Sequence, residues 1–177
     1  DSSVRQWEFD ERGLLKKEIT PLSPDQARKL ISTANKTGAS YAGLYVVALH
    51  TGLREGELLG LQWGDVDLEA TTPTLQVRRT LSETRTGHKF ELPKSGKGRS
   101  IKLSRKAVEA LRSHRARQAE EKLRLGSLWQ DNGLVFPTTT GTTTSGTNLL
   151  GRYFRPLLKR AGLPETFRIH DLRHTCA

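Results

Sequence analysis

The order of hydrophobic and polar residues predicts a chain that is mainly helical. Apolar residues recur at helical spacing after Ser23, and residues 41–50 are apolar nearly all round, which predicts a buried central helix. A further helical run starts near Leu53. Helical spacing returns in residues 104–126 and in residues 148–161, and Pro156 is expected to kink or divide the second of these helices.

A period of two in the middle of the chain predicts a small antiparallel β-sheet. Residues 74–80, 89–92 and 99–103 have strand spacing, and we expect the last two strands to form a hairpin whose tip is rich in glycine and lysine. Residues 138–147 are rich in threonine and glycine and predict a flexible surface loop. The fold class is therefore mainly α with a small antiparallel β-sheet, that is, α+β.

The length of 177 residues fits one domain. We expect this domain to comprise residues 19–177 and residues 1–18 to be a linker or the tail of a preceding unit. The chain has no methionine, and its last residues resemble the first turns of a helix, so we expect a segment of a longer parent protein. No apolar run approaches the ~20 residues that cross a bilayer, so no membrane segment is predicted.

The excess of basic residues favours a polyanionic partner. Lys and Arg number 29 against 19 Asp and Glu, which gives a net charge of +10 and favours nucleic acid, although charge that serves only solubility would look the same. Cys176 is the only cysteine, so neither an internal disulfide nor a thiolate zinc cluster can form within this chain. This composition fits a reducing cytosol.

Two short stretches contain candidate phosphate-binding residues. Arg54 and Glu57 are three residues apart near a helix start, where a carboxylate can hold a guanidinium rigid; a solvated surface pair is the alternative. His170 and Arg173 share one side of the last helix near its N-terminus, which favours anions. His174 follows His170 at a spacing that can bind a metal, but no third ligand is evident and no metal site is predicted.

Further basic residues are candidates for contact with a nucleic-acid backbone. The predicted hairpin tip carries Lys94 and Lys97 and ends at Arg99, so it could lie along phosphates; a solvated turn is the alternative. The helix at residues 148–161 is also strongly basic. Its candidates for DNA contact are Arg152, Arg155 and Lys159, with a solvated face as an equal alternative.

The sequences around Arg54 and around Arg173 resemble those of a known family. Thr51-Gly52-Leu53-Arg54, followed by Glu57-Leu58-Leu59, Leu61, Trp63 and Asp65, is similar to the first conserved box of the tyrosine recombinases, the phage integrase family. His170-Asp171-Leu172-Arg173-His174-Thr175 looks like the start of the second box. Two motifs in the family's order, at a plausible separation, make the resemblance specific.

The resemblance implies a fold, a reaction and a set of roles. It implies the recombinase catalytic-domain fold, incomplete at its C-terminal end, and cleavage of double-stranded DNA through a 3′-phosphotyrosyl intermediate without metal or cofactor. Arg54 and Arg173 would clamp the phosphate, and Glu57 would support Arg54. Lys94 would protonate the leaving oxygen, with Lys97 as the fallback, and His170 would assist proton movement. Other protomers in a synaptic complex would be partners, in the cytoplasm of a bacterial or phage-infected cell.

The family's tyrosine nucleophile does not match any residue here. The three tyrosines of the chain, Tyr41, Tyr45 and Tyr153, all precede the second motif, so we expect these 177 residues to be inactive alone. Three alternatives stay open: a DNA-binding module without catalysis, a type IB topoisomerase, and a basic helical protein that binds RNA or protein.

Overall fold

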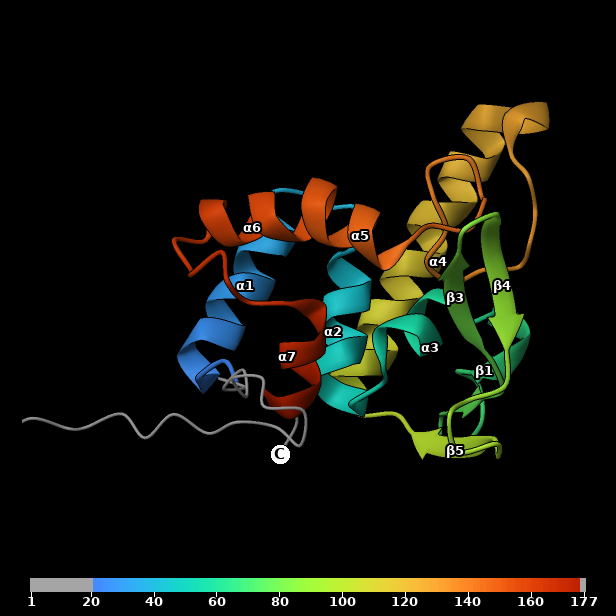
Figure 1. Cartoon of the computed structure of the whole chain (residues 1–177), viewed down its shortest axis with the longest axis horizontal. Coiled ribbons are helices and arrows are strands. Elements are labelled where there is room, and N and C mark those ends of the chain that lie inside the picture. The colour runs from blue at the N-terminus through green and yellow to red at the C-terminus, as the bar shows by residue number, and fades with distance from the viewer. Residues whose placement is uncertain (1–20, 176–177) are drawn as a thin grey trace, which may run out of the picture.

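A computed structural model describes residues 21–175, and the expected linker at residues 1–18 lies outside these described residues. The helices surround a central one, α2, against which α1, α4 and α7 pack (Figure 1). The sheets lie to one side, next to α3. The longer helices are α1 (Pro24–Lys36), α2 (Ala42–Thr51), α4 (Arg105–Leu125), α6 (Arg155–Arg160) and α7 (Ile169–Thr175).

Local sequence signals set the ends of the first helices. Ser23 accepts a hydrogen bond from the backbone N–H of Gln26, whose side chain bonds the backbone of Ser23 in return, so α1 begins with a capping box. The α2 helix is buried along most of its length, as its uniformly apolar sequence predicts. It ends at Gly52, which adopts the left-handed conformation with φ of 65°.

A short helix, α3 (Glu55–Leu59), follows directly and brings Arg54 to its N-terminus. A single turn of 3-10 helix, η1 (Trp63–Asp65), then leads into the first strand. Gly56 in α3 lies so close to the neighbouring strand that an added Cβ atom would be 2.8 Å from the carbonyl oxygen of Leu81. The absence of a side chain there lets α3 pack on the sheet.

The strands form two small antiparallel sheets. One contains β1 (Val66–Asp67), β2 (Thr74–Val77) and β5 (Arg99–Lys102), in the order β1-β2-β5. The other contains β3 (Thr80–Thr84) and β4 (Gly87–Glu91). Val77 of β2 pairs with Arg99 of β5, and Thr80 of β3 pairs with Glu91 of β4, so the two sheets follow each other along the chain without sharing a strand.

The predicted hairpin between residues 89–92 and 99–103 is therefore wrong. These segments do not pair with each other, because β4 pairs with β3 and β5 pairs with β2. The strand β3 was not predicted, because it carries polar side chains with little alternation. Residues 92–98, which include Lys94 and Lys97, form a loop that connects β4 of one sheet to β5 of the other, rather than the tip of a hairpin between two paired strands.

The C-terminal helices confirm the expected division at Pro156. A short α5 (Gly146–Asn148) is followed by a π-helical segment, η3 (Leu149–Phe154), and then by α6 with Pro156 at its first turn. Proline has no N–H to donate, and a change of helix type just before it removes the need for that bond. The α4 helix also begins as predicted, with Ser104 capping the N–H of Ala107, and ends in the 3-10 turn η2 (Gly126–Leu128).

The threonine-rich segment is more ordered than predicted. Thr138 and Thr142 hydrogen-bond through both side chains and backbone, Thr144 is buried, and Thr143 bonds His88 of β4 over 2.6 Å. Threonine hydroxyls that bond locally give this segment a folded shape without regular secondary structure. It packs against the body and the β3–β4 pair instead of forming a loose surface loop.

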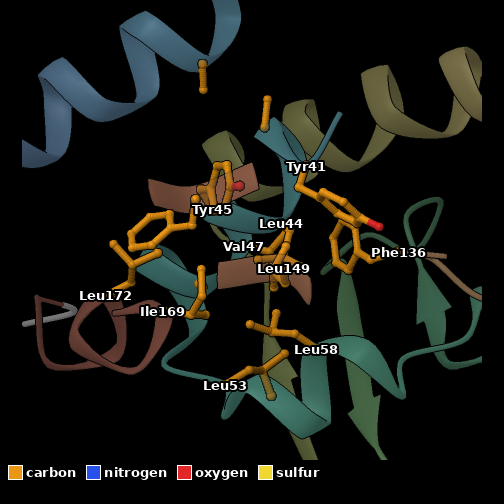
Figure 2. Packing of buried hydrophobic residues seen from close by; sticks show 14 of the residues in the cluster. Tyr41, Leu44, Tyr45, Val47, Leu53, Leu58, Phe136, Leu149, Ile169 and Leu172 are labelled. Carbon is orange, nitrogen blue, oxygen red and sulfur yellow. The ribbon is translucent and has the colours of Figure 1, made fainter. Parts of the chain in front are cut away.

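One continuous hydrophobic core lies around α2 (Figure 2). Leu44 and Val47 of α2 contribute to it together with Leu58 of α3 and Leu172 of α7, all of them fully buried. Tyr41 and Tyr45 belong to the same core. The core fixes α3 and α7 to the same helix, so it also fixes the two sequence motifs relative to each other.

Candidate active site

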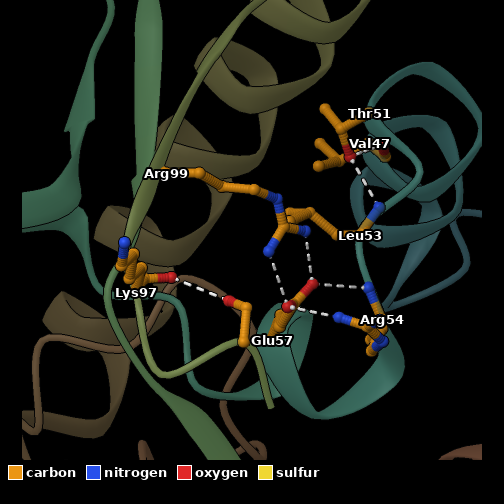
Figure 3. Close-up of polar contacts among 8 residues, drawn as sticks. Val47, Thr51, Leu53, Arg54, Glu57, Lys97 and Arg99 are labelled. Atoms are coloured by element: carbon orange, nitrogen blue, oxygen red, sulfur yellow. Dashed lines mark hydrogen bonds and ion pairs between the residues drawn. The ribbon is translucent and has the colours of Figure 1, made fainter. Parts of the chain in front are cut away.

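A buried carboxylate, that of Glu57, organises the first motif. Its side chain is about 1% exposed and accepts the backbone N–H of Arg54 over 2.8 Å and a side-chain N–H of Arg54 over 3.4 Å. The two terminal nitrogens of Arg99 donate to its two oxygens over 2.9 and 2.8 Å (Figure 3). The alternative of a solvated surface pair is therefore wrong for Glu57.

The start of α3 explains this arrangement. Arg54 is the residue before the first helical turn, and the acid three positions later accepts its N–H, as in a capping box. A carboxylate in the first turn also interacts favourably with the helix dipole. The carboxylate of Glu57 therefore accepts a backbone N–H that would otherwise lack a partner at the helix start, and it holds Arg54 at the mouth of the turn. Its single negative charge is shared between Arg54 and Arg99.

Glu57 is an anion at neutral pH. Burial alone would raise the pKa of its carboxyl, but the hydrogen bonds from Arg99 and from the Arg54 backbone, with the charges of both arginines, outweigh burial and lower that pKa. The bond to Glu57 correspondingly raises the pKa of Arg99. Arg99, predicted to contact DNA, thus uses both terminal nitrogens on Glu57, and a DNA phosphate could reach only its remaining donors.

The second predicted arginine lies beside the first motif. Arg173 is on α7, which packs against α2, and a Cβ atom added at Gly52 would be 3.8 Å from its Cγ atom. Its Nη1 nitrogen is buried and has no hydrogen-bond partner among residues 21–175. The structure therefore brings Arg173 to the turn that immediately precedes Arg54, and a buried donor of its guanidinium has no acceptor among the described residues.

The start of α7 has the same arrangement as the start of α3: a buried acid accepts the backbone N–H of an arginine three residues before it. Asp171 is 4% exposed and accepts the backbone N–H of Arg168 over 2.8 Å and its guanidinium over 3.0 Å. The sequence analysis did not single out this pair. The spacing of an arginine three residues before an acid at a helix start, which it used for Arg54 and Glu57, could have identified it.

His170 is exposed at the start of α7. Its Nε2 atom lies 3.1 Å from Nε2 of His174, and the two rings meet edge to face with centroids 4.9 Å apart. Burial first, and then the neighbouring His174, Arg168 and Arg173, lower the pKa of His170, while Asp171 acts in the opposite direction. His170 is therefore neutral at physiological pH and can exchange a proton with a bound group.

Lys94 and Lys97 lie in the exposed loop at residues 92–98. Gly96 adopts φ of 67° and donates to the carbonyl of Pro93, and the Ser95 hydroxyl donates to the carbonyl of Lys97. No hydrogen bond or ion pair joins Lys94 to another described residue. The loop is attached to the site at its end, because Arg99, the next residue, is the one that binds Glu57.

A second buried acid binds the segment between β2 and β3. Asp65, 6% exposed, pairs with Arg79 and more weakly with Arg78, the two residues that connect these strands. Asp65 was named as part of the first motif, without a partner. Its partners are more than ten residues away, so spacing within a helix does not reveal them.

The remaining basic candidates lie on a different helix. Arg152, Arg155 and Lys159 are exposed along η3 and α6, spaced so that they follow one side of the helical segment. None of them forms an ion pair with another described residue. The structure thus leaves all three available to a polyanion but does not join them to the arginines of the site.

Two further features concern ligands and membranes. Within residues 21–175 no three His, Cys, Asp or Glu side chains are grouped so that they could hold a metal ion. None of the described helices is long and apolar enough to cross a membrane.

Comparison with known proteins identifies relatives over most of the chain. The model of the phage integrase family matches residues 21–177. A XerC-like tyrosine recombinase of Caldanaerobacter subterraneus subsp. tengcongensis is 36% identical over 173 residues, which cover 90% of this chain and 43% of the relative. An integrase of Streptomyces ambofaciens is 33% identical over 159 residues, 85% of this chain and 39% of the relative. The chain thus spans less than half the length of these relatives.

Solved structures agree with this assignment. XerA recombinase is 31% identical, with a TM-score of 0.64 over 88% of this chain and 48% of that chain. The Tn1549 transposon integrase in complex with a circular intermediate DNA gives a TM-score of 0.73 at 23% identity over 90% of this chain and 52% of that chain, which shows the fold alone. Because the family model covers most of its residues, this chain belongs to the phage integrase family, and its fold is the tyrosine recombinase catalytic-domain fold.

Proposed function

We propose that this chain is part of the catalytic domain of a site-specific DNA recombinase that cleaves and rejoins DNA strands. The observation that carries the proposal is the buried Nη1 atom of Arg173, which has no partner in the described part of the chain, on a side chain whose Cγ atom lies beside Gly52 in the turn before Arg54. A buried cationic donor without an acceptor is costly, so its retention supports an anionic ligand. A DNA phosphate is the ligand that suits two guanidiniums.

The two arginines act on the transition state of phosphoryl transfer. Attack on a phosphodiester gathers negative charge on the equatorial oxygens of phosphorus, and fixed guanidiniums stabilise that charge more than they stabilise the starting diester. Glu57 supports this function by holding Arg54 through its backbone and side chain. Arg173 lies on α7, which packs on α2, and Glu57 holds Arg54 at the start of α3, so the clamp is preorganised.

The proton transfers fall to two other groups. A tyrosine hydroxyl attacks phosphorus and loses its proton to His170, and the bond from phosphorus to the 5′ oxygen breaks. Lys94 protonates that leaving oxygen, so the products are a 3′-phosphotyrosyl link and a free 5′ hydroxyl. The reverse sequence rejoins the strand. In this scheme the arginines supply the positive charge, and no cofactor takes part.

The tyrosine nucleophile comes from outside these 177 residues. Tyr41 donates its hydroxyl to the carbonyl of Pro137, and Tyr45 is 1% exposed, so both serve the core. Burial raises the pKa of each hydroxyl further. Tyr153 packs edge to face on Tyr41 with ring centroids 4.8 Å apart. We therefore propose that the chain alone is inactive and that its parent protein supplies the tyrosine.

Double-stranded DNA and further protomers are the proposed partners, in the cytoplasm where the DNA target lies. The net charge of +10 supports a polyanionic partner. Exposed cations at Lys97, Arg152, Arg155 and Lys159 would bind the phosphate backbone on either side of the clamped phosphate. Residues 19–177 would then be the catalytic unit, and residues 1–18 a linker or the tail of a preceding domain.

The test separates catalysis from DNA binding. In the parent protein, Arg173→Gln should lower the rate of covalent adduct formation on a nicked target duplex by at least about a thousandfold, while the Kd for the same DNA changes only a few-fold. Arg152→Gln is the matched control, because it removes one exposed cation and should weaken binding without slowing cleavage of bound DNA. Equal losses of affinity in both variants, with no adduct in the wild type, would identify a DNA-binding module without catalysis.

A further inference from the structure

His174 has no assigned role, although it is the nearest polar neighbour of His170. The two residues are four apart on α7, on the same side of the helix, and their Nε2 atoms are 3.1 Å apart. This distance corresponds to a hydrogen bond between the two imidazole nitrogens. His174 is exposed, so its ring is not needed to fill the core.

A hydrogen bond between two imidazoles links their protonation. One Nε2 atom must carry the proton and the other must offer its lone pair, so each ring determines the tautomer of the other. If both Nε2 atoms carried protons, the two N–H groups would face each other and the bond would be lost. The contact therefore allows two arrangements of a neutral pair.

Only one arrangement leaves His170 able to take a proton. If Nε2–H of His170 donates to Nε2 of His174, the Nδ1 atom of His170 keeps its lone pair. In the opposite arrangement Nδ1 of His170 carries a proton and has no free lone pair with which to accept another proton. Burial, and then the neighbouring His174, Arg168 and Arg173, lower the pKa of His170, while Asp171 acts in the opposite direction, so the ring is neutral and can keep that lone pair.

We propose that His174 is a positioning residue that accepts Nε2–H from His170 and thereby holds Nδ1 of His170 as the proton acceptor of the site. This inference rests on the proposed function and deepens it. When His170 takes the tyrosine proton on Nδ1, the hydrogen bond to His174 becomes a bond from a cation and strengthens. His174 thus orients the ring before the reaction and stabilises its charged form during the reaction.

The tautomers can be measured in the 177-residue chain without any DNA. Long-range proton–nitrogen NMR spectra of a chain with labelled histidines should show His170 protonated on Nε2 and His174 protonated on Nδ1. The state of His174 is the diagnostic one, because a solvated histidine prefers a proton on Nε2. In His170→Phe, His174 should return to the Nε2–H form. A proton on Nδ1 of His170, or rings that exchange both tautomers freely, would overturn the proposal.

Kinetics in the parent protein test the same contact during catalysis. His174→Phe keeps an aromatic ring but removes the acceptor, and it should slow cleavage of bound DNA at least about tenfold with an unchanged Kd. His174→Gln keeps an acceptor oxygen and should restore most of the rate. A wild-type rate in His174→Phe, or equal losses in Phe and Gln variants, would overturn the inference. Absence of cleavage in the wild type would instead defeat the proposed function, and the tautomer measurement would still decide the contact.

Discussion

Glu57 and Arg99 are 42 residues apart in sequence and form a bidentate ion pair, with nitrogen–oxygen distances of 2.9 and 2.8 Å. This pair joins the first motif to the strand that follows the lysine-bearing loop. Arg54 binds the same carboxylate from the other side. The charge of Glu57 therefore holds Arg54 and the end of the loop in one place.

Removing that charge should destabilise the chain. Glu57→Gln leaves Arg99 and Arg54 facing a neutral amide in a buried position. We expect a loss of about 3 kcal/mol in the free energy of unfolding, at the low end for a broken buried pair because both arginines are partly exposed. Urea denaturation of the 177-residue chain measures it. In the control Glu109→Gln, which breaks the exposed pair with Arg105, the loss should stay below about 0.5 kcal/mol.

The stability of the chain should fall on mild acidification because of His114. This residue is buried on α4, its Nε2 bonds the carbonyl of Val135, and burial lowers its pKa to about 4. In the unfolded chain the ring titrates near its ordinary pKa of 6.5. Between pH 6.5 and about 4, His114 is protonated in the unfolded chain but stays neutral in the folded chain. The free energy of unfolding therefore decreases as pH falls through this window.

Denaturation at a series of pH values tests this assignment. The difference in unfolding free energy between pH 7 and pH 4.5 should be about 2 kcal/mol smaller in His114→Gln than in the wild type. His88→Gln is the matched control, because His88 is exposed on β4. The same pH dependence in His114→Gln and the wild type would show that another group is responsible.

Gly56 in α3 is closely packed, whereas Gly64 in the 3-10 turn η1 has free space around its Cα atom, so the two allow a test of the packing at α3. A Cβ atom at Gly56 would lie 2.3 Å from the Thr80 hydroxyl and 2.8 Å from the Leu81 carbonyl, so Gly56→Ala forces α3 away from β3. We expect a loss of about 2–3 kcal/mol in the free energy of unfolding. Gly64 has nothing within 4 Å of an added Cβ, so Gly64→Ala should be nearly neutral. Similar losses in the two variants would contradict the tight packing.

Local patterns predicted much of the fold because they act within a few residues. The capped start of α1, the uniformly apolar α2 and the division at Pro156 each depend on neighbours along the chain. The pairing of β4 with β3 did not follow, because β3 is polar and its register depends on a partner that the pattern does not name. The same limit hid the pairs that Asp65 forms with Arg78 and Arg79.

The sequence predicted which residues belong to the candidate site better than it predicted the contacts between them. Arg54, Glu57 and Arg173 were named from two motifs, and the structure brings Arg173 to the turn before Arg54. Arg99 was expected to contact DNA. In the structure it binds Glu57, because the buried carboxylate on α3 needs a nearby positive charge and Arg99 on β5 supplies it. Spacing identifies residues that share a helix; it does not show which distant strand supplies the counter-charge.

Lys94 gives the sharpest test of the proposed roles in the loop, because it and Lys97 are both exposed there and differ only in position. If Lys94 protonates the 5′ leaving oxygen, Lys94→Ala in the parent protein should slow adduct formation about a hundredfold or more, whereas Lys97→Ala should mainly weaken DNA binding. A DNA substrate whose 5′ bridging oxygen is replaced by sulfur separates the two roles. A thiolate leaves readily without a proton, so this substrate should restore the rate of Lys94→Ala but not that of Arg173→Gln, whose defect is in stabilising charge on phosphorus. Rescue of Lys97→Ala instead would assign the acid to Lys97, and rescue of neither lysine variant would show that the loop only binds DNA.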